Sequence, residues 1–409
     1  MMNVLYLGKF YPKTLLKTIK DDSRGKVGLS NHNFEMSILN GLSQQDDIDL
    51  KCITCPSVYA YPHNNKRLYT KAESYDYKSI HIESAGFCNI TGIKELSAAI
   101  STARLILRMV ETFSGDNVNI LINTPDIRLF NAIGFAERRT KKHLTKTVII
   151  PDIPAMVTAM DRHNPIKSYL LSKADSKVMN YTSNCDGLVL LTEAMMDFIS
   201  KPIKHILMEG IVDVSAMDKP KDDTVTNKKV ILYTGTLRRL FGVMNLVNAF
   251  KMVHDENVEL WICGSGDSKE AIESAAKEDV RIKFYGLVDS KTALEMQRKA
   301  TILVNPRTSD GEYTKYSFPS KTMEYLLAGR SVIINRLPGI PEEYYNYVYT
   351  PKDESVKALA ECISYVLHLD ENTRASRSEA GRQFIIEKKN SEVQIARVIK
   401  MIESYACAE

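Results

Sequence analysis

The chain has 409 residues, of which 44% are hydrophobic and 25% are charged, and its formal net charge is +4. This length exceeds the size at which one hydrophobic core keeps growing, so we expect two domains. The hydrophobic and charged fractions are ordinary for a soluble globular protein. The mild positive charge does not by itself indicate a nucleic-acid partner, although it suits a polyanionic small substrate or an anionic membrane surface.

The cysteines and the apolar runs indicate the compartment. Seven cysteines, an odd number spread along the chain, are typical of a reducing environment. Cys52 and Cys55 form a Cys-x-x-Cys pair, but no second pair and no nearby histidine completes a metal site in the sequence. No apolar run reaches membrane-spanning length, and residues 3–7 indicate a first strand rather than a signal peptide. We therefore expect a cytoplasmic protein that needs no metal or other cofactor.

The first half alternates predicted strands and helices. Apolar runs predict strands over residues 3–7, 48–54, 118–122, 147–150, 187–191 and 204–212. Helical spacing of apolar residues predicts helices over residues 28–42, 94–113, 126–144 and 166–181. Residues 58–92 lack periodicity, which predicts a long loop with short strands. Residues 213–227 are polar, contain Pro220 and lack a hydrophobic period, so they predict a linker between two domains.

Three residues of the first half are candidates for contacts with a ligand. Ligands of doubly wound sheets bind where the carboxyl ends of the strands meet the following loops. Gly28 opens the first predicted helix after such a loop and lets a substrate approach the backbone. His32 follows one turn later and is either a substrate contact or, as we prefer, a capping residue. Asp152 follows the strand at 147–150, which places a carboxylate at a strand tip.

The helix predicted at 126–144 ends in a basic cluster, formed by Arg138, Arg139, Lys141, Lys142 and Lys146. A solvated helix end is the simpler interpretation. The alternative is peripheral contact with anionic lipid headgroups, or with a lipid-linked diphosphate, at the inner face of the cell membrane.

The second half repeats the alternation more regularly. Apolar runs predict strands over residues 230–233, 258–263, 281–285, 301–304 and 331–335. Helices are predicted over residues 243–255, 268–278, around Leu294, and over 319–329, 354–368, 371–388 and 391–406. Strictly alternating strands and helices predict an α/β fold built on doubly wound parallel sheets.

Two turns of the second half suit a nucleoside diphosphate. Residues 234–242 contain Gly235 and Thr236, followed by two guanidiniums that can bind phosphate oxygens in a bidentate way, Arg238 and Arg239. Gly264 and Gly266 form a second turn that permits close approach of a ligand. No third glycine follows at the spacing of a dinucleotide-binding loop, and no Walker sequence is present, which argues against those two classes.

A third turn opens the helix at 319–329, with Ser320 as its predicted N-cap. The backbone N–H groups at a helix start and the cation of Lys321 suit a phosphate. A capping box would need Glu or Gln at position 323, where the chain has Met323. Glu324 is therefore predicted to be free to accept hydrogen bonds from another group, such as sugar hydroxyls.

These motifs resemble those of the retaining glycosyltransferases of family 4. Five stretches carry the resemblance in order and spacing over residues 228–345: Tyr233-Thr234-Gly235-Thr236-Leu237, Trp261-Ile262-Cys263-Gly264-Ser265-Gly266-Asp267, Phe284-Tyr285-Gly286, Asn305-Pro306-Arg307 and Phe318-Pro319-Ser320-Lys321-Thr322-Met323-Glu324-Tyr325. The first half matches more weakly, through Gly28, residues 151–154, Thr192-Glu193 and residues 209–213.

The resemblance implies the GT-B architecture, two Rossmann-like, doubly wound parallel-sheet domains that face each other across a cleft. Residues 1–212 would form the acceptor-side domain, with the last helix and its tail, 391–409, packing back on it. Residues 213–390 would form the domain that binds the nucleotide sugar.

The resemblance also implies roles for residues. Glu324 matches the second Glu of the family's Glu-x7-Glu element, which holds the donor ribose. Ser320 and Lys321 match positions whose backbone N–H groups hold the donor diphosphate, and Gly235 lies in the matching glycine loop. The family's first Glu falls on Tyr316, so Glu312, Lys315 and Tyr316 are the candidate contacts to the donor sugar.

Two further departures concern the cations of the glycine loop. The family usually has Arg just after the first glycine and Lys just before the next one, where this chain has Thr236 and Phe241. Arg238 or Arg239 must then supply the cation. The Phe-Pro-Ser-Lys sequence resembles a branch of the family that builds bacterial capsule or exopolysaccharide.

The implied activity is metal-independent transfer of a sugar, with retention, from a nucleoside-diphosphate sugar to a saccharide or lipid-linked saccharide acceptor. Arg238 or Arg239, Lys321 and the helix start would stabilise the charge on the leaving nucleoside diphosphate. Two alternatives remain open. One is a GT-B sugar-nucleotide epimerase, and the other is a non-catalytic partner subunit, which Tyr316, Thr236 and Phe241 favour.

Overall fold

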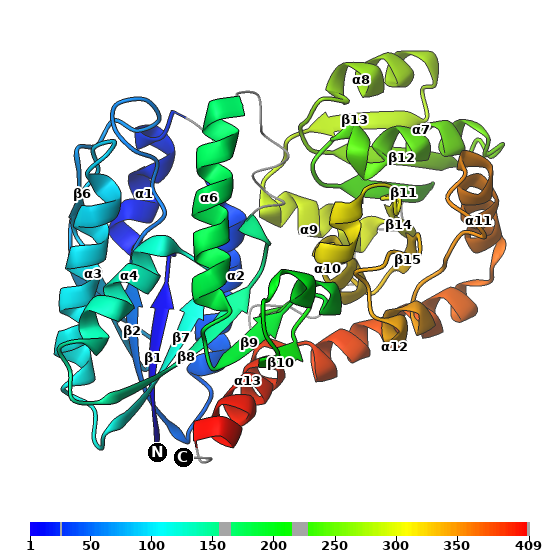
Figure 1. Ribbon diagram of the computed structural model, residues 1–409. Helices are drawn as coiled ribbons and strands as arrows, with labels where there is room; N and C mark the ends of the chain where they lie inside the picture. The colour runs from blue at the N-terminus through cyan, green and yellow to red at the C-terminus, as the bar shows by residue number, and fades with distance from the viewer. Residues whose placement is uncertain (25–26, 155–164, 215–227, 407–409) are drawn as a thin grey trace. The chain divides into compact units, whose positions relative to one another are not determined.

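The computed structural model describes residues 1–24, 27–154, 165–214 and 228–406. The chain divides into two compact units (Figure 1). Unit 1 comprises Met1–Asp213 together with Ser391–Glu409, and unit 2 comprises Val214–Asn390. Each unit has its own sheet and its own hydrophobic core.

Unit 1 is built on an eight-stranded sheet with the order β10-β9-β8-β7-β1-β2-β5-β4. All neighbours in it are parallel except β4 and β5. The central strands are buried along nearly their whole length, as expected for a parallel sheet covered on both faces. The strands of this sheet are β1 (Met2–Gly8), β2 (Ile48–Thr54), β4 (Glu73–Tyr77), β5 (Ile80–Ser84), β7 (Asn117–Asn123), β8 (His143–Ile150), β9 (Gly187–Leu190) and β10 (Lys204–Leu207).

A second, two-stranded antiparallel sheet pairs β3 (Tyr69–Thr70) with β6 (Phe87–Cys88). With β4 and β5 it makes up the short strands expected within residues 58–92. Within the described ranges, unit 1 also contains the helical segments α1 (Lys13–Asp22), α2 (Leu29–Leu42), α3 (Lys94–Val110), α4 (Ile127–Glu137), α6 (Pro165–Thr182), η1 (Glu193–Phe198) and α13 (Ser391–Ala406).

The C-terminal helix α13 packs against α2 over one face of the sheet of unit 1. Ile38 of α2 and Ile395 of α13 lie in the same buried cluster. The Asn40 side chain donates to Ser391 Oγ at 3.1 Å, which joins the two helices by a buried hydrogen bond. Gly41 lies so close to α13 that an added Cβ would overlap the carbonyl oxygen of Ser391.

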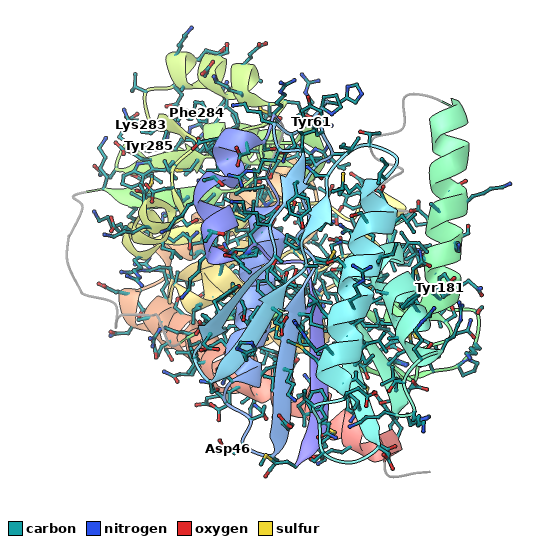
Figure 2. All side chains as sticks on the ribbon, turned by 90° about the vertical axis from the view of Figure 1, so that its left-hand side faces the viewer. Asp46, Tyr61, Tyr181, Lys283, Phe284 and Tyr285 are labelled. Carbon is teal, nitrogen blue, oxygen red and sulfur yellow. The ribbon has the colours of Figure 1, made fainter. Side chains whose placement is uncertain are left out.

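On α6, Tyr181 stacks on Phe130 of α4 with ring centroids 5.6 Å apart, and it is labelled in Figure 2. Within the described residues, no helix is long and apolar enough to cross a membrane.

Unit 2 contains a five-stranded, fully parallel sheet with the order β13-β12-β11-β14-β15. Its strands are β11 (Lys229–Thr234), β12 (Val258–Cys263), β13 (Ile282–Gly286), β14 (Ile302–Asn305) and β15 (Ser331–Ile334). Edge strand β13 exposes Lys283 and Tyr285, which Figure 2 labels. A charged side chain on an edge strand opposes pairing with another sheet.

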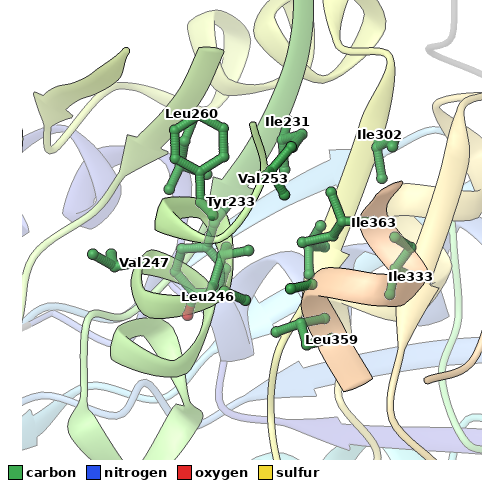
Figure 3. Packing of buried hydrophobic residues seen from close by; sticks show 14 of the residues in the cluster. Ile231, Tyr233, Leu246, Val247, Val253, Leu260, Ile302, Ile333, Leu359 and Ile363 are labelled. Carbon is green, nitrogen blue, oxygen red and sulfur yellow. The ribbon is translucent and has the colours of Figure 1, made fainter. Parts of the chain in front are cut away.

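Helices cover both faces of this sheet. On one face, Ile231 and Tyr233 pack with Leu246 and Ile363 in the cluster of Figure 3. The helices of that face are α7 (Val243–Lys251), α8 (Lys269–Glu278) and α11 (Val356–His368). The side chain of Thr234 points to the other face of the sheet, where α9 (Ser290–Lys299) and α10 (Lys321–Leu327) lie. Helix α12 (Glu371–Lys388) packs against α10 and β15. The predicted α/β, doubly wound fold class is therefore confirmed.

Two expectations about helices were wrong. The helix expected at 126–144 ends at Glu137, because residues 143–150 pair with β7 as strand β8. Helix α1, over Lys13–Asp22, was not expected, because only Leu15 and Ile19 of it are buried and so its apolar signal is weak.

The basic cluster consequently only begins at a helix end, where Arg138 is the C-cap of α4. Lys146 lies on β8 and pairs with Glu137 at 2.6 Å. Lys142 donates to the Phe113 carbonyl at 2.6 Å, and the Arg139 guanidinium lies 3.5 Å from the ring centroid of Phe135. These three cations are thus engaged within unit 1, while Arg138 and Lys141 are exposed.

The close contact at Gly41 leads to a test of stability. We expect Gly41→Ala to lower the free energy of unfolding, because the overlap with Ser391 outweighs the better helix propensity of alanine. Gly134 in α4 is a matched control, since no atom lies within 4 Å of the position of an added Cβ. Gly134→Ala should instead raise stability by roughly 0.5–1 kcal/mol. Chemical denaturation of both variants measures the two signs, and a stabilised Gly41→Ala protein would contradict the close packing of α13.

Candidate functional site

The carboxyl edge of the unit 2 sheet carries loops that are bonded to one another. Gly235 N donates to the Cys263 carbonyl at 3.0 Å, and Leu237 N donates to the Ser265 carbonyl at 2.9 Å. A Cβ on Gly264 would overlap the Gly235 carbonyl, and one on Gly266 would overlap Leu237. These two glycines were expected to admit a ligand. The structure shows that the packing of one loop on another already requires them.

The loop after β11 also contacts the loop after β14. Gly242 has φ = +73°, a left-handed conformation that favours glycine, and its added Cβ would overlap the Pro306 carbonyl. Asn335 donates to the Arg307 carbonyl at 2.9 Å and holds the β14 loop from the other side. Because β12 and β14 flank β11, these loops lie at the point where the strand order reverses. Open α/β sheets bind their ligands at such points.

The helix start differs from the one expected. Helix α10 begins at Lys321, and Ser320 already has helical angles, with φ = −52° and ψ = −27°. An N-cap side chain reaches the backbone from an extended conformation, so Ser320 makes no side-chain capping bond. Thr322 N bonds instead to the Pro319 carbonyl at 2.8 Å.

Glu324 is not free, contrary to our expectation. Lys321 Nζ lies 2.7 Å from both of its carboxylate oxygens. Gln297 Nε2 donates to Glu324 Oε1 at 2.5 Å and to Thr234 Oγ1 at 2.9 Å. About a third of the Lys321 and Glu324 side chains is exposed (34% and 32%), so this network presents an oriented carboxylate and a cation to solvent. A carboxylate has about four lone-pair sites, and a hydroxyl can still donate to it.

The other donor-side candidates differ in exposure. Thr236 and Arg239 are exposed, and Arg238 is half-buried. The backbone N–H of Arg239 donates to Asp267 Oδ1 at 2.8 Å. In the segment η3 (Glu312–Tyr316), Glu312 is exposed whereas Tyr316 is only 7% exposed. The sugar contact that the resemblance assigned to position 316 would have to come from a largely buried side chain.

Arg307 is a feature that residue-by-residue reasoning missed. It follows β14 directly and is only 9% exposed. Its signal in the sequence was a basic residue at the tip of a buried strand, within Asn305-Pro306-Arg307.

The acceptor-side candidates belong to unit 1. Gly28 is the residue before α2. Among the described residues, its added Cβ would meet only Tyr11 Oη, at 3.8 Å, so they do not demand glycine there. His32 is buried, and its Nδ1 accepts a hydrogen bond from Tyr11 N at 3.3 Å. Burial lowers the pKa of His32, which favours a neutral imidazole.

Asp152 follows β8 and is exposed, yet desolvation by the surrounding protein raises its pKa to about 6. No hydrogen bond or ion pair among the described residues joins Asp152 to Gly28 or His32.

A second group that the sequence did not reveal lies at the reversal point of the unit 1 sheet, beyond the end of β1. Glu35 Oε2 accepts hydrogen bonds from Lys9 N at 2.8 Å and from Tyr6 Oη at 3.2 Å. Complete burial raises the pKa of Glu35 to about 7. Nearby, Asp126 forms ion pairs with Lys9 at 3.1 Å and Arg128 at 2.7 Å, and these cations hold its pKa well below the usual value despite burial.

Over the described part of the chain, no three His, Cys, Asp or Glu side chains gather in a way that could hold a metal ion. The six cysteines within these ranges are free thiols, including Cys52 and Cys55.

Known proteins resemble this chain in two ways. Residues 228–368 match the family described as Glycosyl transferases group 1. A putative colanic acid biosynthesis glycosyl transferase, WcaI of Escherichia coli strain K12, is 27% identical over 187 residues. That alignment covers 44% of this chain and 44% of WcaI, so it spans less than half of either protein.

Solved structures match over nearly the whole chain. Sucrose-phosphate synthase of Thermosynechococcus elongatus has a TM-score of 0.63 at 14% identity, with all of both chains covered. HepE of Anabaena, solved in complex with UDP, has a TM-score of 0.63 at 12% identity, with 98% of this chain and 100% of HepE covered. The fold is GT-B. The expected GT-B fold class, with Rossmann-like parallel-sheet units, is thereby confirmed, and the match of residues 228–368 to the glycosyl transferases group 1 family supports the resemblance seen in the sequence.

Glu35 gives the GT-B chain a pH dependence that can be tested. Its folded pKa of about 7 lies above the ordinary 4.5, so the folded state binds the extra proton. The bound proton stabilises the folded state near pH 4.5. As the pH rises through 7, the free energy of unfolding should therefore fall by up to about 3 kcal/mol. Glu35→Gln should abolish this loss. Unfolding free energies between pH 5 and 8 measure it, with Glu95→Gln at an exposed position as the control. If the unfolding free energies of the wild type and of Glu35→Gln changed with pH in parallel, the raised pKa of Glu35 would be contradicted.

Proposed function

We propose that this protein is a retaining glycosyltransferase of family 4 that transfers a sugar from a nucleoside-diphosphate sugar to a saccharide or lipid-linked saccharide acceptor. The observation that carries the proposal is the Lys321–Glu324–Gln297 network. It lies within the residues that match the glycosyltransferase group 1 family, and Gln297 anchors it to Thr234 at the end of β11. A fixed carboxylate suits the ribose hydroxyls of a nucleotide, and a neighbouring cation suits its diphosphate.

In this proposal the donor diphosphate contacts unit 2. The backbone N–H groups of Ser320 and Lys321 stand at a helix start, where they have no acceptor within the helix. The positive charges of Lys321 and of either Arg238 or Arg239 would also bind the diphosphate. Gly235 and Thr236 would line the phosphate loop beside Gly264 and Gly266. Glu312, Lys315 and Tyr316 remain the candidates for the donor sugar.

The chemistry then amounts to stabilising a leaving group. Negative charge builds on the nucleoside diphosphate as its bond to the sugar breaks, and positioned cations lower the barrier. The acceptor hydroxyl attacks on the face that the leaving group vacates, so the configuration is retained. We propose that the cations of the protein suffice for this step, so EDTA should leave the transfer rate unchanged.

Unit 1 would bind the acceptor. Asp152 has a pKa of about 6, so an ionised fraction is available near neutral pH to accept the proton of a hydroxyl hydrogen bond. Gly28 and His32 are the other candidates of this unit. A lipid-linked acceptor would bring the protein to the cytoplasmic face of a membrane, where the exposed Arg138 and Lys141 suit anionic headgroups. Because WcaI is described as a colanic acid transferase, surface polysaccharide is the product class we propose.

The alternative of a non-catalytic GT-B subunit rests on a specific observation, the burial of Tyr316. A non-catalytic subunit would keep the nucleotide site, so it predicts nucleotide binding without turnover. The epimerase alternative shares the donor but predicts consumption of the nucleotide sugar without an acceptor.

Nucleotide binding is the first test. A thermal-shift screen with UDP, GDP, ADP, CMP and NAD should find stabilisation by one nucleoside diphosphate. A ligand at a hundred times its dissociation constant stabilises the fold by about 2.7 kcal/mol, which such a screen detects readily. UDP is the first candidate, because HepE was solved with UDP. Stabilisation by NAD alone would contradict the proposal and indicate a dehydrogenase.

The network itself can be tested by substitution. Glu324→Ala should lower kcat/KM for transfer roughly tenfold to a hundredfold, the value of a hydrogen bond to a charged group, and Lys321→Ala should act similarly. Lys251 and Glu278 form a surface pair of the same unit with the same 2.7 Å separation, so Glu278→Ala is the matched control. Equal activity of Glu324→Ala and Glu278→Ala would show that the donor site is elsewhere.

A further inference from the structure

The Arg307 guanidinium lies close to two aromatic rings at the reversal point of the unit 2 sheet. It follows β14, and its Cζ lies 4.7 Å from the ring centroid of Tyr313 and 5.5 Å from that of Phe241. Phe241 belongs to the loop after β11, and Tyr313 belongs to η3. Arg307 therefore reaches the place where three segments of the candidate donor site meet.

This cation is buried without a carboxylate. Its Nη2 donates to Ser317 Oγ at 2.7 Å, but its buried Nε has no acceptor among the described residues. Across those residues, no Asp or Glu forms an ion pair with Arg307. The side chain is nevertheless more than nine-tenths buried. An unpaired charge in such a place costs free energy, so proteins normally pair it.

Two other largely buried arginines of this protein are each paired with a carboxylate, which offsets the cost of burying the charge. Arg128 of unit 1 binds Asp126 through both Nε, at 3.0 Å, and Nη2, at 2.7 Å. Arg281 of unit 2 binds Asp279 in the same bidentate way, at 3.0 and 2.8 Å, and lies 4.8 Å from the ring centroid of Phe250. Arg281 and Arg307 thus each have an aromatic neighbour. Among the described residues, only Arg281 of the two also has a carboxylate partner.

We propose that the missing anion is the diphosphate of the donor, which pairs with the Arg307 guanidinium. The inference rests on the proposed function for the identity of the donor. Three observations favour a phosphate. The site lies at the carboxyl end of the strands, where open α/β sheets bind ligands, and the adjacent loop adds Arg238 and Arg239. A planar guanidinium also suits bidentate binding of phosphate oxygens. Desolvation lowers the pKa of Arg307, which agrees with a cation that lacks its counterion.

Arg307→Met keeps the length of the side chain and removes the charge. In the free protein we expect an unchanged or higher melting temperature, because an uncompensated buried cation is removed. Affinity for UDP, GDP, ADP and CDP, whichever binds the wild type, should fall at least tenfold, whereas the matching nucleoside should bind as before. Inorganic pyrophosphate should stabilise the wild type and not the variant.

Arg281→Met is the matched control, because it removes a guanidinium that stacks on an aromatic ring but has its own carboxylate. It should lower the melting temperature, since Asp279 loses its partner, and leave affinity for the nucleoside diphosphate and pyrophosphate unchanged. Arg307→Lys keeps the charge without the planar fork, so it should bind the diphosphate with intermediate affinity. If Arg307→Met does not fold, Arg307→Lys decides.

The outcomes separate this inference from the proposed function. A less stable Arg307→Met protein that binds nucleoside diphosphate and pyrophosphate like the wild type makes Arg307 a packing residue and overturns the inference alone. Arg307-dependent binding of pyrophosphate without binding of any nucleotide supports the anion site and overturns the proposed donor. A wild-type protein stabilised by none of these probes overturns both.

Discussion

The position of the candidate donor site depends on one buried hydrogen-bond network at the end of β11. Tyr325 Oη accepts from Thr234 N at 2.9 Å and donates to the Thr234 carbonyl at 3.1 Å, which ties α10 to the central strand. Gln297 of α9 binds both Thr234 and Glu324. Because a buried polar group left without its partner is costly, each member fixes the next. The side-chain hydroxyl of Thr234, at the end of the central strand, is thereby linked through Gln297 to a partly exposed carboxylate.

The loops around this network use glycine to approach one another rather than only to admit a ligand. Gly242 and Gly264 both occupy positive φ angles, and side chains there would overlap backbone carbonyls of neighbouring loops. The Gly242 contact holds the backbone beside Arg307, because it packs on the carbonyl of Pro306. A backbone held in this way suits electrostatic stabilisation of a leaving group, because donors fixed in advance need no reorganisation during the reaction.

Both units concentrate ionisable groups where their strand order reverses, but they balance charge differently. In unit 1, Asp126 has Lys9 and Arg128 as partners, and Glu35 responds to burial by a higher pKa. In unit 2, neither applies to Arg307. No carboxylate of the described residues pairs with it, and a guanidinium does not lose its proton near neutral pH. An imbalance that folding leaves uncorrected is typical of a site that serves a ligand.

The sequence by itself determined the alternation of strands and helices, the doubly wound sheet of unit 2 and the stretches that match glycosyltransferases. These follow from local signals, since apolar runs, helical periods and glycine spacings are properties of neighbouring residues. Only the tertiary structure decided that the helix expected at 126–144 ends at Glu137 and that the strand expected at 147–150 begins at His143, because pairing with β7 outweighs local spacing. It likewise decided that Glu324 is held by Gln297 and Lys321, that Ser320 does not cap α10, and that Arg307 is buried without a carboxylate. Such facts depend on which residues distant in sequence meet in space, and on which partners are missing there. No local pattern contains that information.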